Sequence, residues 1–233
     1  MEEYTRRLIH VPIIHSPADM GSMGAELAAA CIERLGRRHW DDYVAMLATF
    51  WQSVRAGLDR LRLDYGRVNL YQDGLPVCGK ELEIVKAAVA KGSENYQLIL
   101  DLISRGATLM GTEDPKLLLE EYHKVQAALA SRSSLDPGAP GVCQGSSDND
   151  SGRNVDQADR TRELMAERDA YLSRRINESL RPGRTGILFL GLMHNIESYL
   201  AEDIVVTRLV EKSKSQNVEK SKRRPLGFDV LTF

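Results

Sequence analysis

Two histidines and two carboxylates each stand just after an apolar segment of this 233-residue chain, and side chains of these types can move protons or hold a metal ion. They are His15, Asp73, Glu113 and His194. The pKa of an imidazole lies near neutrality, so it can take a proton from water while a nearby carboxylate orients its ring. The same side chains also bind divalent transition metals and leave a position open for water. The sequence therefore keeps two chemistries open, water activation and metal binding.

The segments before these residues have the pattern of an α/β fold. Short apolar strands are expected at residues 6–15, 67–71, 107–110, 186–191 and 204–207. Helices are expected at residues 24–35, 40–61, 80–91, 94–104, 115–125 and 160–180. This alternation is typical of parallel βαβ units, and it predicts a mostly parallel sheet of about five strands flanked by helices. Ligands of such sheets bind outside the carboxyl ends of the strands, so we expect the four residues to share one cleft.

Several polar residues near the strand ends also have purely structural interpretations. Asp73 precedes a glycine and could be an ordinary turn residue, while Asp114 precedes a proline and is a good helix N-cap. Asp19 follows the first strand. The adjacent Arg168 and Asp169 are most simply a solvated pair on a helix, although the arginine could reach an anionic ligand. For the two histidines a functional role is favoured, because a fully buried strand has little reason to end in an imidazole.

Composition and charge exclude several classes of protein. Hydrophobic residues make up 42% and charged residues 27% of the chain, which excludes a wholly disordered, collagenous or disulfide-framework protein. The net charge of −2 gives no general attraction to nucleic acid or to anionic membranes. The three cysteines lack CxxC spacing, and neither a signal peptide nor a run of about 18 apolar residues is present. We expect a cytoplasmic protein with a small-molecule or peptide ligand and no membrane or nucleic-acid partner.

The chain is expected to form one folded unit. Residues 1–211 are predicted to be a single α/β domain. Residues 131–158 contain no aromatic side chain and few large aliphatic ones, so they predict a disordered insertion. Residues 212–233 are expected to be a basic, solvated tail, because six basic residues and one acidic residue lie between positions 212 and 224.

A longer motif near the end of the chain resembles a known superfamily. The pair Arg168-Asp169 on a helix is followed by a strand that ends Gly191-Leu-Met-His194. This arrangement resembles the closing motif of the erythromycin esterase, ChaN and TraB/Tiki superfamily, an Arg-Asp helix followed by a strand and Gly-x-x-His. The other candidates fall in the expected order. The first strand departs from the family's Gly-Glu-x-His or Gly-Thr-x-His, since it ends Pro-Ile-Ile-His15.

The resemblance implies a site more than it implies a reaction. Members of the superfamily include an esterase that uses histidine-activated water, proposed metal-dependent proteases and haem-binding proteins. The leading hypothesis is a hydrolase-like enzyme in which water is activated between His15 and His194. Asp73 and Glu113 would orient this water or would assist its activation through a divalent metal ion, and the bond cleaved would be an ester or an amide.

Two further residues and an alternative complete the hypothesis. Arg168 and Asp19 are expected to bind the substrate, the arginine through an anionic group. The alternative is a non-catalytic protein of the same fold, with a regulatory or ligand-binding role. In that case His15, His194 and Asp73 would bind a divalent metal, or the histidines a haem-like group, or the site would take another small ligand.

Overall fold

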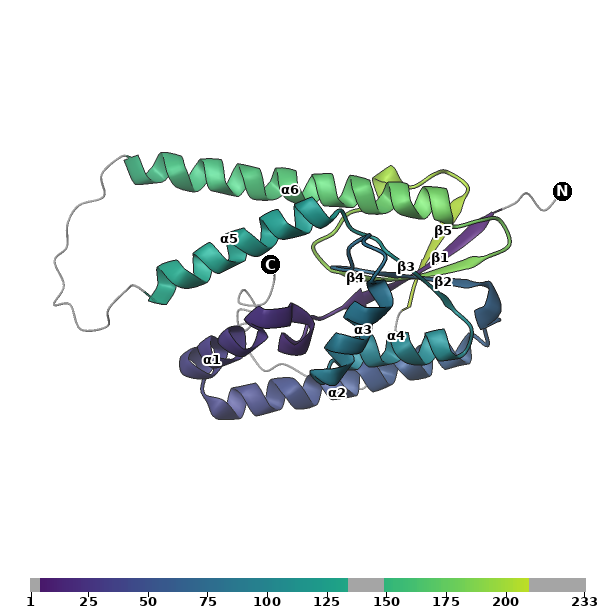
Figure 1. The fold of residues 1–233 in the computed structure, drawn as a ribbon, viewed down its shortest axis with the longest axis horizontal. Coiled ribbons are helices and arrows are strands. Elements are labelled where there is room, and N and C mark those ends of the chain that lie inside the picture. Colours follow the sequence, from purple (N-terminus) through teal and green to yellow (C-terminus); the bar gives the residue numbers. More distant parts are fainter. Residues whose placement is uncertain (1–4, 134–148, 210–233) are drawn as a thin grey trace, which may run out of the picture.

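A five-stranded parallel sheet forms the centre of the protein, as a computed structural model shows for residues 5–133 and 149–209 (Figure 1). Its strands are β1 (Arg6–Ile13), β2 (Val68–Gln72), β3 (Thr108–Met110), β4 (Thr185–Gly191) and β5 (Ile204–Arg208). They lie in the order β3-β2-β4-β1-β5, and every neighbouring pair is parallel. The predicted α/β fold with a parallel sheet is therefore confirmed.

β4 is the central strand, and its sequence explains its place. Its five interior residues, from Gly186 to Leu190, are all buried. A parallel strand covered on both faces needs such a continuous apolar run rather than an alternating one. In register, Ile187 lies between Ile9 of β1 and Leu70 of β2. β4 thus holds together the two strands that carry His15 and Asp73 at their ends.

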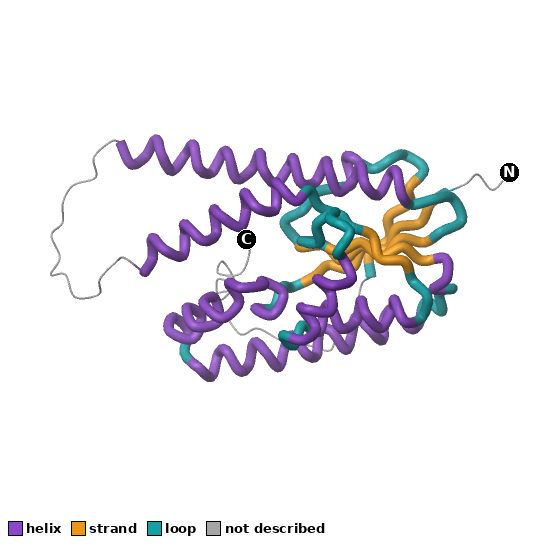
Figure 2. Tube along the Cα trace, in the orientation of Figure 1, coloured by secondary structure: helices purple, strands orange, loops and turns teal. Residues whose placement is uncertain are grey.

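Helices cover both faces of the sheet (Figure 2). They are α1 (Gly24–Leu35), α2 (Arg37–Arg60), α3 (Glu81–Ala90), α4 (Glu94–Ser104), α5 (Pro115–Ser133) and α6 (Asn149–Ser179). Short 3-10 helices are η1 (Pro17–Met23), η2 (Tyr65–Arg67) and η3 (Glu197–Tyr199). The expected helices are all present, and Gly36 separates α1 from α2 with a φ of 85° that favours glycine.

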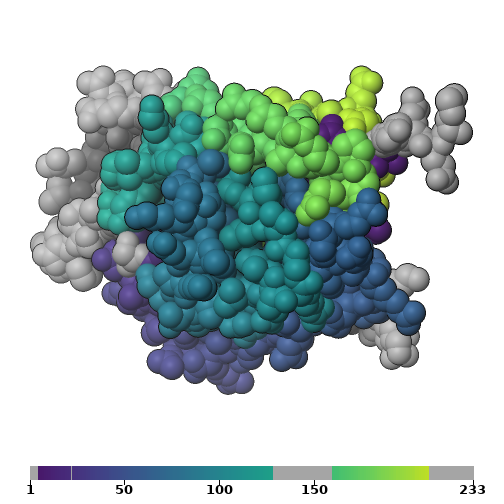
Figure 3. Space-filling view, turned by 45° about the vertical axis from the view of Figure 1, so that its right-hand side comes forward, coloured from purple at the N-terminus to yellow at the C-terminus, as the bar shows by residue number. Residues whose placement is uncertain are grey.

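Two buried clusters bind these helices to the sheet. On one face, Trp51 of α2 and Ile99 of α4 pack with Val11 of β1. On the other face, Leu172 and Ile176 of α6 pack with strand residues. In a space-filling view, the green residues of α6 lie along the top of the molecule, and the purple-blue residues of α1 and α2 lie along the bottom (Figure 3). α6 therefore lies across the sheet, with its middle turns against the carboxyl ends of the strands.

Two helices run further than the sequence predicted. α5 continues to Ser133 and α6 begins at Asn149, so residues 131–133 and 149–158 of the expected disordered insertion are helical. The composition of a segment indicates how much apolar surface it can bury. A helix that already exists, however, can be extended without a new nucleation step, because each added residue forms one more hydrogen bond. The rest of that insertion and the tail at 212–233 lie outside the described residues.

Within residues 5–133 and 149–209, none of the helices combines the length and the apolar character that crossing a membrane requires.

The buried centre of β4 should dominate stability. Phe189 is fully buried, so Phe189→Ala removes a large apolar contact and leaves a cavity. We expect a loss of roughly 3–5 kcal/mol in the free energy of unfolding, measured by urea denaturation. Val205→Ala on the edge strand β5 is the control, because 49% of Val205 is exposed and its loss should cost about 0.5 kcal/mol or less. Equal effects of the two variants would contradict the layered core.

Candidate functional site

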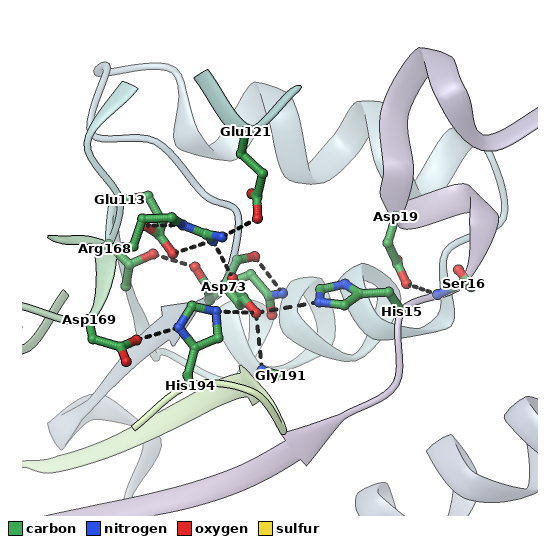
Figure 4. A network of polar contacts seen from close by, with 12 residues as sticks. His15, Ser16, Asp19, Asp73, Glu113, Glu121, Arg168, Asp169, Gly191 and His194 are labelled. Carbon is green, nitrogen blue, oxygen red and sulfur yellow. Dashed lines mark hydrogen bonds and ion pairs between the residues drawn. The ribbon is translucent and has the colours of Figure 1, made fainter. Parts of the chain in front are cut away.

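The carboxyl ends of the strands bring four predicted residues together (Figure 4). His15 follows β1, Asp73 follows β2, Glu113 lies beyond β3, and His194 lies beyond β4. Figure 4 shows the Asp73 carboxylate between the two imidazole rings, with Glu113 and Arg168 to its upper left. The four side chains meet as expected, but Asp73 and Glu113 are buried, and neither hollow that the structure shows is lined by all four residues of the expected cleft.

Asp73 is the centre of the cluster. Its Oδ2 lies 3.4 Å from Nε2 of His15 and 3.4 Å from Nε2 of His194, and it accepts the N–H of Gly191 at 3.0 Å. Its Oδ1 accepts a hydrogen bond from Arg168 at 3.0 Å. Burial alone would raise the pKa of the Asp73 carboxyl, but the two histidines hold it well below its ordinary value. Asp73 is thus a buried carboxylate ion with four polar neighbours, not only a turn residue.

Arg168 supplies the buried positive charge of the site. Its Nη2 donates to Asp73 at 3.0 Å and to Glu113 at 2.9 Å, and its Nη1 donates to Glu121 at 2.7 Å. Only 3% of the residue is exposed, so the solvated pair expected at positions 168 and 169 is wrong. The reason is the placement of α6, which turns this part of the helix toward the sheet. All three guanidinium nitrogens donate to carboxylates of the chain, so the structure makes Arg168 an internal counter-ion.

Glu113 is the most deeply buried carboxyl group of the cluster. It is fully shielded from solvent and receives two hydrogen bonds from Arg168. Burial raises the pKa of the Glu113 carboxyl, and the charge of Arg168 only partly offsets this effect. Glu121 of α5 was not among the predicted residues. It sits on the solvent side of the same guanidinium, with 26% of its side chain exposed.

His194 is held from both sides by carboxylates. Its Nδ1 lies 2.5 Å from Asp169 Oδ1, and the other oxygen of Asp169 accepts the N–H of Asn195 at 2.8 Å. Burial lowers the pKa of His194, but the hydrogen bonds with Asp169 and Asp73 outweigh it and raise the pKa to about 10. His194 is therefore an imidazolium at neutral pH. Asp169 was missed as a site residue, although its place beside Arg168 in the Arg-Asp motif was the available signal.

His15 is the histidine that solvent can reach. Its side chain is 28% exposed, whereas that of His194 is 4% exposed. The Tyr43 hydroxyl of α2 donates to the His15 carbonyl at 2.9 Å, which fixes the backbone where β1 ends. Burial lowers the pKa of His15, but the hydrogen bond and charge of Asp73 raise it above its ordinary value. His15 is thus an oriented imidazole at the open side of the cluster.

Asp19 has a structural role in this fold. One of its oxygens accepts the N–H of Ser16 at 2.6 Å, and the other accepts the hydroxyl of Ser93. It thereby closes the first turn of η1 and ties it to the start of α4. Both oxygens are engaged within the chain, in contrast to the expected role in substrate binding. Asp114 caps α5 as its position before a proline indicates, since it accepts the N–H of Lys116 at 2.7 Å.

The predicted metal site depends on whether its donor atoms are free to bind an ion. Among the described residues, one group could hold an ion: ligand atoms of Asp73, Glu113 and His194 lie within 4.8 Å of one another. Both carboxylates, however, are already paired with the guanidinium of Arg168 at 2.9–3.0 Å. A divalent ion would have to displace that arginine. As arranged here, these residues do not fit a resident metal, because Arg168 already supplies the positive charge.

Two hollows of the described part of the chain lie outside the centre of the cluster. One, of about 310 Å³, is lined by Pro12, Phe50, Ser53, Val54, Gly57, Arg60, Arg208 and Leu209. A second, of about 20 Å³, lies on the far side of His194 and has room for about one water molecule.

Comparison with protein families, with curated proteins and with solved structures finds no match for the chain. The resemblance to the erythromycin esterase, ChaN and TraB/Tiki superfamily stays a prediction.

The raised pKa of His194 predicts how stability depends on pH. The charged ring is stabilised in the folded state only, so its contribution is complete below pH 6.5 and is lost as the pH rises toward 10. We expect the difference in unfolding free energy between the parent protein and His194→Gln to shrink by on the order of a few kcal/mol over that range. Urea denaturation at pH 6.5, 8 and 10 measures it. A difference that stays constant would contradict the charged state.

The position of Arg168 predicts the response to metals. In isothermal titration with Zn²⁺, we expect the parent protein to show no binding tighter than about 1 μM, because both carboxylates are neutralised. Arg168→Met frees Asp73 and Glu113 and should create a site with a stoichiometry of about one. The control is Arg160→Met, which removes an exposed arginine of the same helix. Tight binding to the parent protein that Asp73→Asn abolishes would show that the metal displaces the arginine.

Proposed function

We propose that this protein is a hydrolase that cleaves an ester or an amide bond with water, and that His15 is its general base. The observation that carries the proposal is the contact between a partly exposed imidazole and a buried, ionised carboxylate. Nε2 of His15 lies 3.4 Å from Asp73, whose carboxylate is itself fixed by Arg168 and Gly191. An imidazole oriented in this way can accept a proton from water.

The environments of the two histidines favour different roles. A base must be unprotonated when water binds, and His194, with a pKa of about 10, is protonated at neutral pH. His194 is also shielded from solvent, since 4% of its side chain is exposed. It supports the charge and position of Asp73, which in turn orients His15. In this proposal, the water expected to be activated between His15 and His194 has one base, His15, and one charged supporting residue, His194.

The reaction follows from these roles. As the water oxygen forms a bond to the carbonyl carbon, its proton moves to His15, and the carbonyl electron pair moves onto the carbonyl oxygen. Asp73 stabilises the imidazolium that forms. When the carbonyl is restored, the bond to the alcohol or amine breaks, and this leaving group takes the proton from His15. The products are a carboxylic acid and an alcohol or amine, and His15 returns to its neutral form.

The resemblance described above supports the same reaction class. The Arg-Asp helix and the Gly-x-x-His segment, which carry the resemblance, are the segments that hold Asp73 and His194 in this cluster. One member of that superfamily is an esterase with histidine-activated water. Arg168 forms ion pairs with three carboxylates of the same chain. This pairing favours hydrolysis by histidine-activated water over a metal-dependent reaction.

The proposal is tested with a panel of p-nitrophenyl esters and peptide anilides. We expect His15→Ala and His15→Gln to lower kcat/KM by about 10²–10⁴, the usual contribution of a general base. His39→Ala is the control, because His39 is exposed on α2. Below the pKa of His15 the parent rate should fall, since the protonated ring cannot accept a proton. Turnover that survives both His15 substitutions would exclude this base.

A further inference from the structure

The larger of the two hollows lies between α2 and the ends of β1 and β5, apart from the cluster described above. Its volume is about 310 Å³, at the lower end of the roughly 300–1,000 Å³ of small-molecule sites. Apolar side chains, among them Phe50, Val54 and Leu209, form much of its wall. Of the described residues that line it, Arg60 and Arg208 carry a charge and none is acidic. The hollow therefore suits a short apolar segment that carries a negative charge.

The chain leaves the described part of the structure at this hollow. Leu209 lines the hollow and is the last residue described. Its N–H donates to the carbonyl of His10 at 2.8 Å, which extends the pairing of β5 with β1. Its side chain lies against Gly57 of α2, where a Cβ would be 3.3 Å from both of its methyl carbons. A glycine weakens a helix interior relative to alanine, and here it lets the end of β5 pass close to α2. The residues that follow Leu209 are thus tethered beside the hollow.

The sequence beyond the hollow contains a segment of the required chemistry. Residues 212–224 are strongly basic, so the two arginines of the hollow would repel them. Residues 225–233 have the opposite character, since they include two of the four phenylalanines of the chain and one charged side chain, Asp229. Such a segment can place Phe228 on the apolar wall and its carboxylate beside an arginine.

The length of the connection allows the segment to return to the hollow. Residues 210–224 could span up to about 50 Å when fully extended. A flexible connection of this kind holds its two ends at an effective concentration on the order of millimolar. A second copy of the chain at ordinary protein concentrations would have to compete with that value. Tethering therefore favours residues 225–233 of the same chain as the occupant.

We propose that residues 225–233 dock into this hollow, with Phe228 against its apolar wall and Asp229 beside Arg60. Arg208, the other arginine of the hollow, already donates to an acidic residue of η3 at 2.9 Å. The docked segment covers the apolar space between α2 and the edge of the sheet. The inference is independent of the proposed hydrolase activity, because the hollow is separate from the histidines and its occupancy is measured without turnover.

Photo-crosslinking in the full chain locates the docked segment. With Phe228→p-benzoylphenylalanine, we expect intramolecular crosslinks to the α2 peptide that contains Phe50 and Val54, mapped by mass spectrometry. The control is Gln216→p-benzoylphenylalanine, in the basic stretch. It should give about tenfold fewer crosslinks to α2, because burial of one large apolar side chain favours the docked position by roughly that factor or more. Equal yields at the two positions, or crosslinks only to other surfaces, would overturn the docking.

Hydrogen exchange of residues 225–233 measures the docking without a photoreactive group. We expect Phe228→Ser to speed exchange of this segment about tenfold or more, whereas the control Thr232→Ser leaves it near the parent rate. Both substitutions lie outside the described fold, so the sheet and its helices are retained.

Charge reversal tests the pairing with the arginine. Arg60→Glu should speed the exchange roughly two- to fivefold, and the double variant with Asp229→Arg should restore it. Exchange in the parent as fast as in an unstructured peptide would exclude docking. Protection that is lost on dilution would show that a second copy supplies the segment, and it would overturn docking within one chain.

Discussion

The buried guanidinium of Arg168 is the interaction on which the cluster depends. Three carboxylates converge on it, and Glu113 and Asp73 are almost completely shielded from water. A buried carboxylate ion without a partner costs several kcal/mol, so two of them could not lie side by side without a cation between them. Because Arg168 is part of α6, the helix that covers the sheet also neutralises the site. Packing of the core and assembly of the site are thus one event.

Differences in burial, rather than in residue type, separate the roles in the site. His15 and His194 face the same oxygen at the same distance, yet 28% of one side chain and 4% of the other are exposed. The shielded ring lies between two carboxylates and keeps its proton, whereas the other borders solvent. An identical pair of side chains thereby becomes a charged support and a titrating group. The ring of His194 is shielded because it packs against Asp169 and Asp73, although the neighbouring Leu192 and Met193 are exposed.

The fold and the meeting of His15, Asp73 and His194 could be predicted because both follow from local patterns. Apolar runs separated by helices indicate a parallel sheet, and such a sheet brings the ends of its strands together. The partners of these residues could not be predicted in this way. Whether Asp169 faces a histidine or solvent depends on the rotation of α6 over the sheet, and the task of Asp19 depends on a contact with Ser93 at the start of α4. Such tertiary contacts produce no periodic pattern in the sequence from which they could be predicted.

The order of the strands has a consequence for how the protein is made. β1 and β2 are produced early, but each pairs with β4, which begins only at Thr185. A chain still emerging from the ribosome therefore carries two of its strands without their shared neighbour, and the edges that pair with β4 stay open until Thr185–Gly191 has been made. Any product truncated before this point lacks both the central strand and the second histidine. The central strand and the contact between His194 and Asp73 therefore depend on the same late segment of the chain.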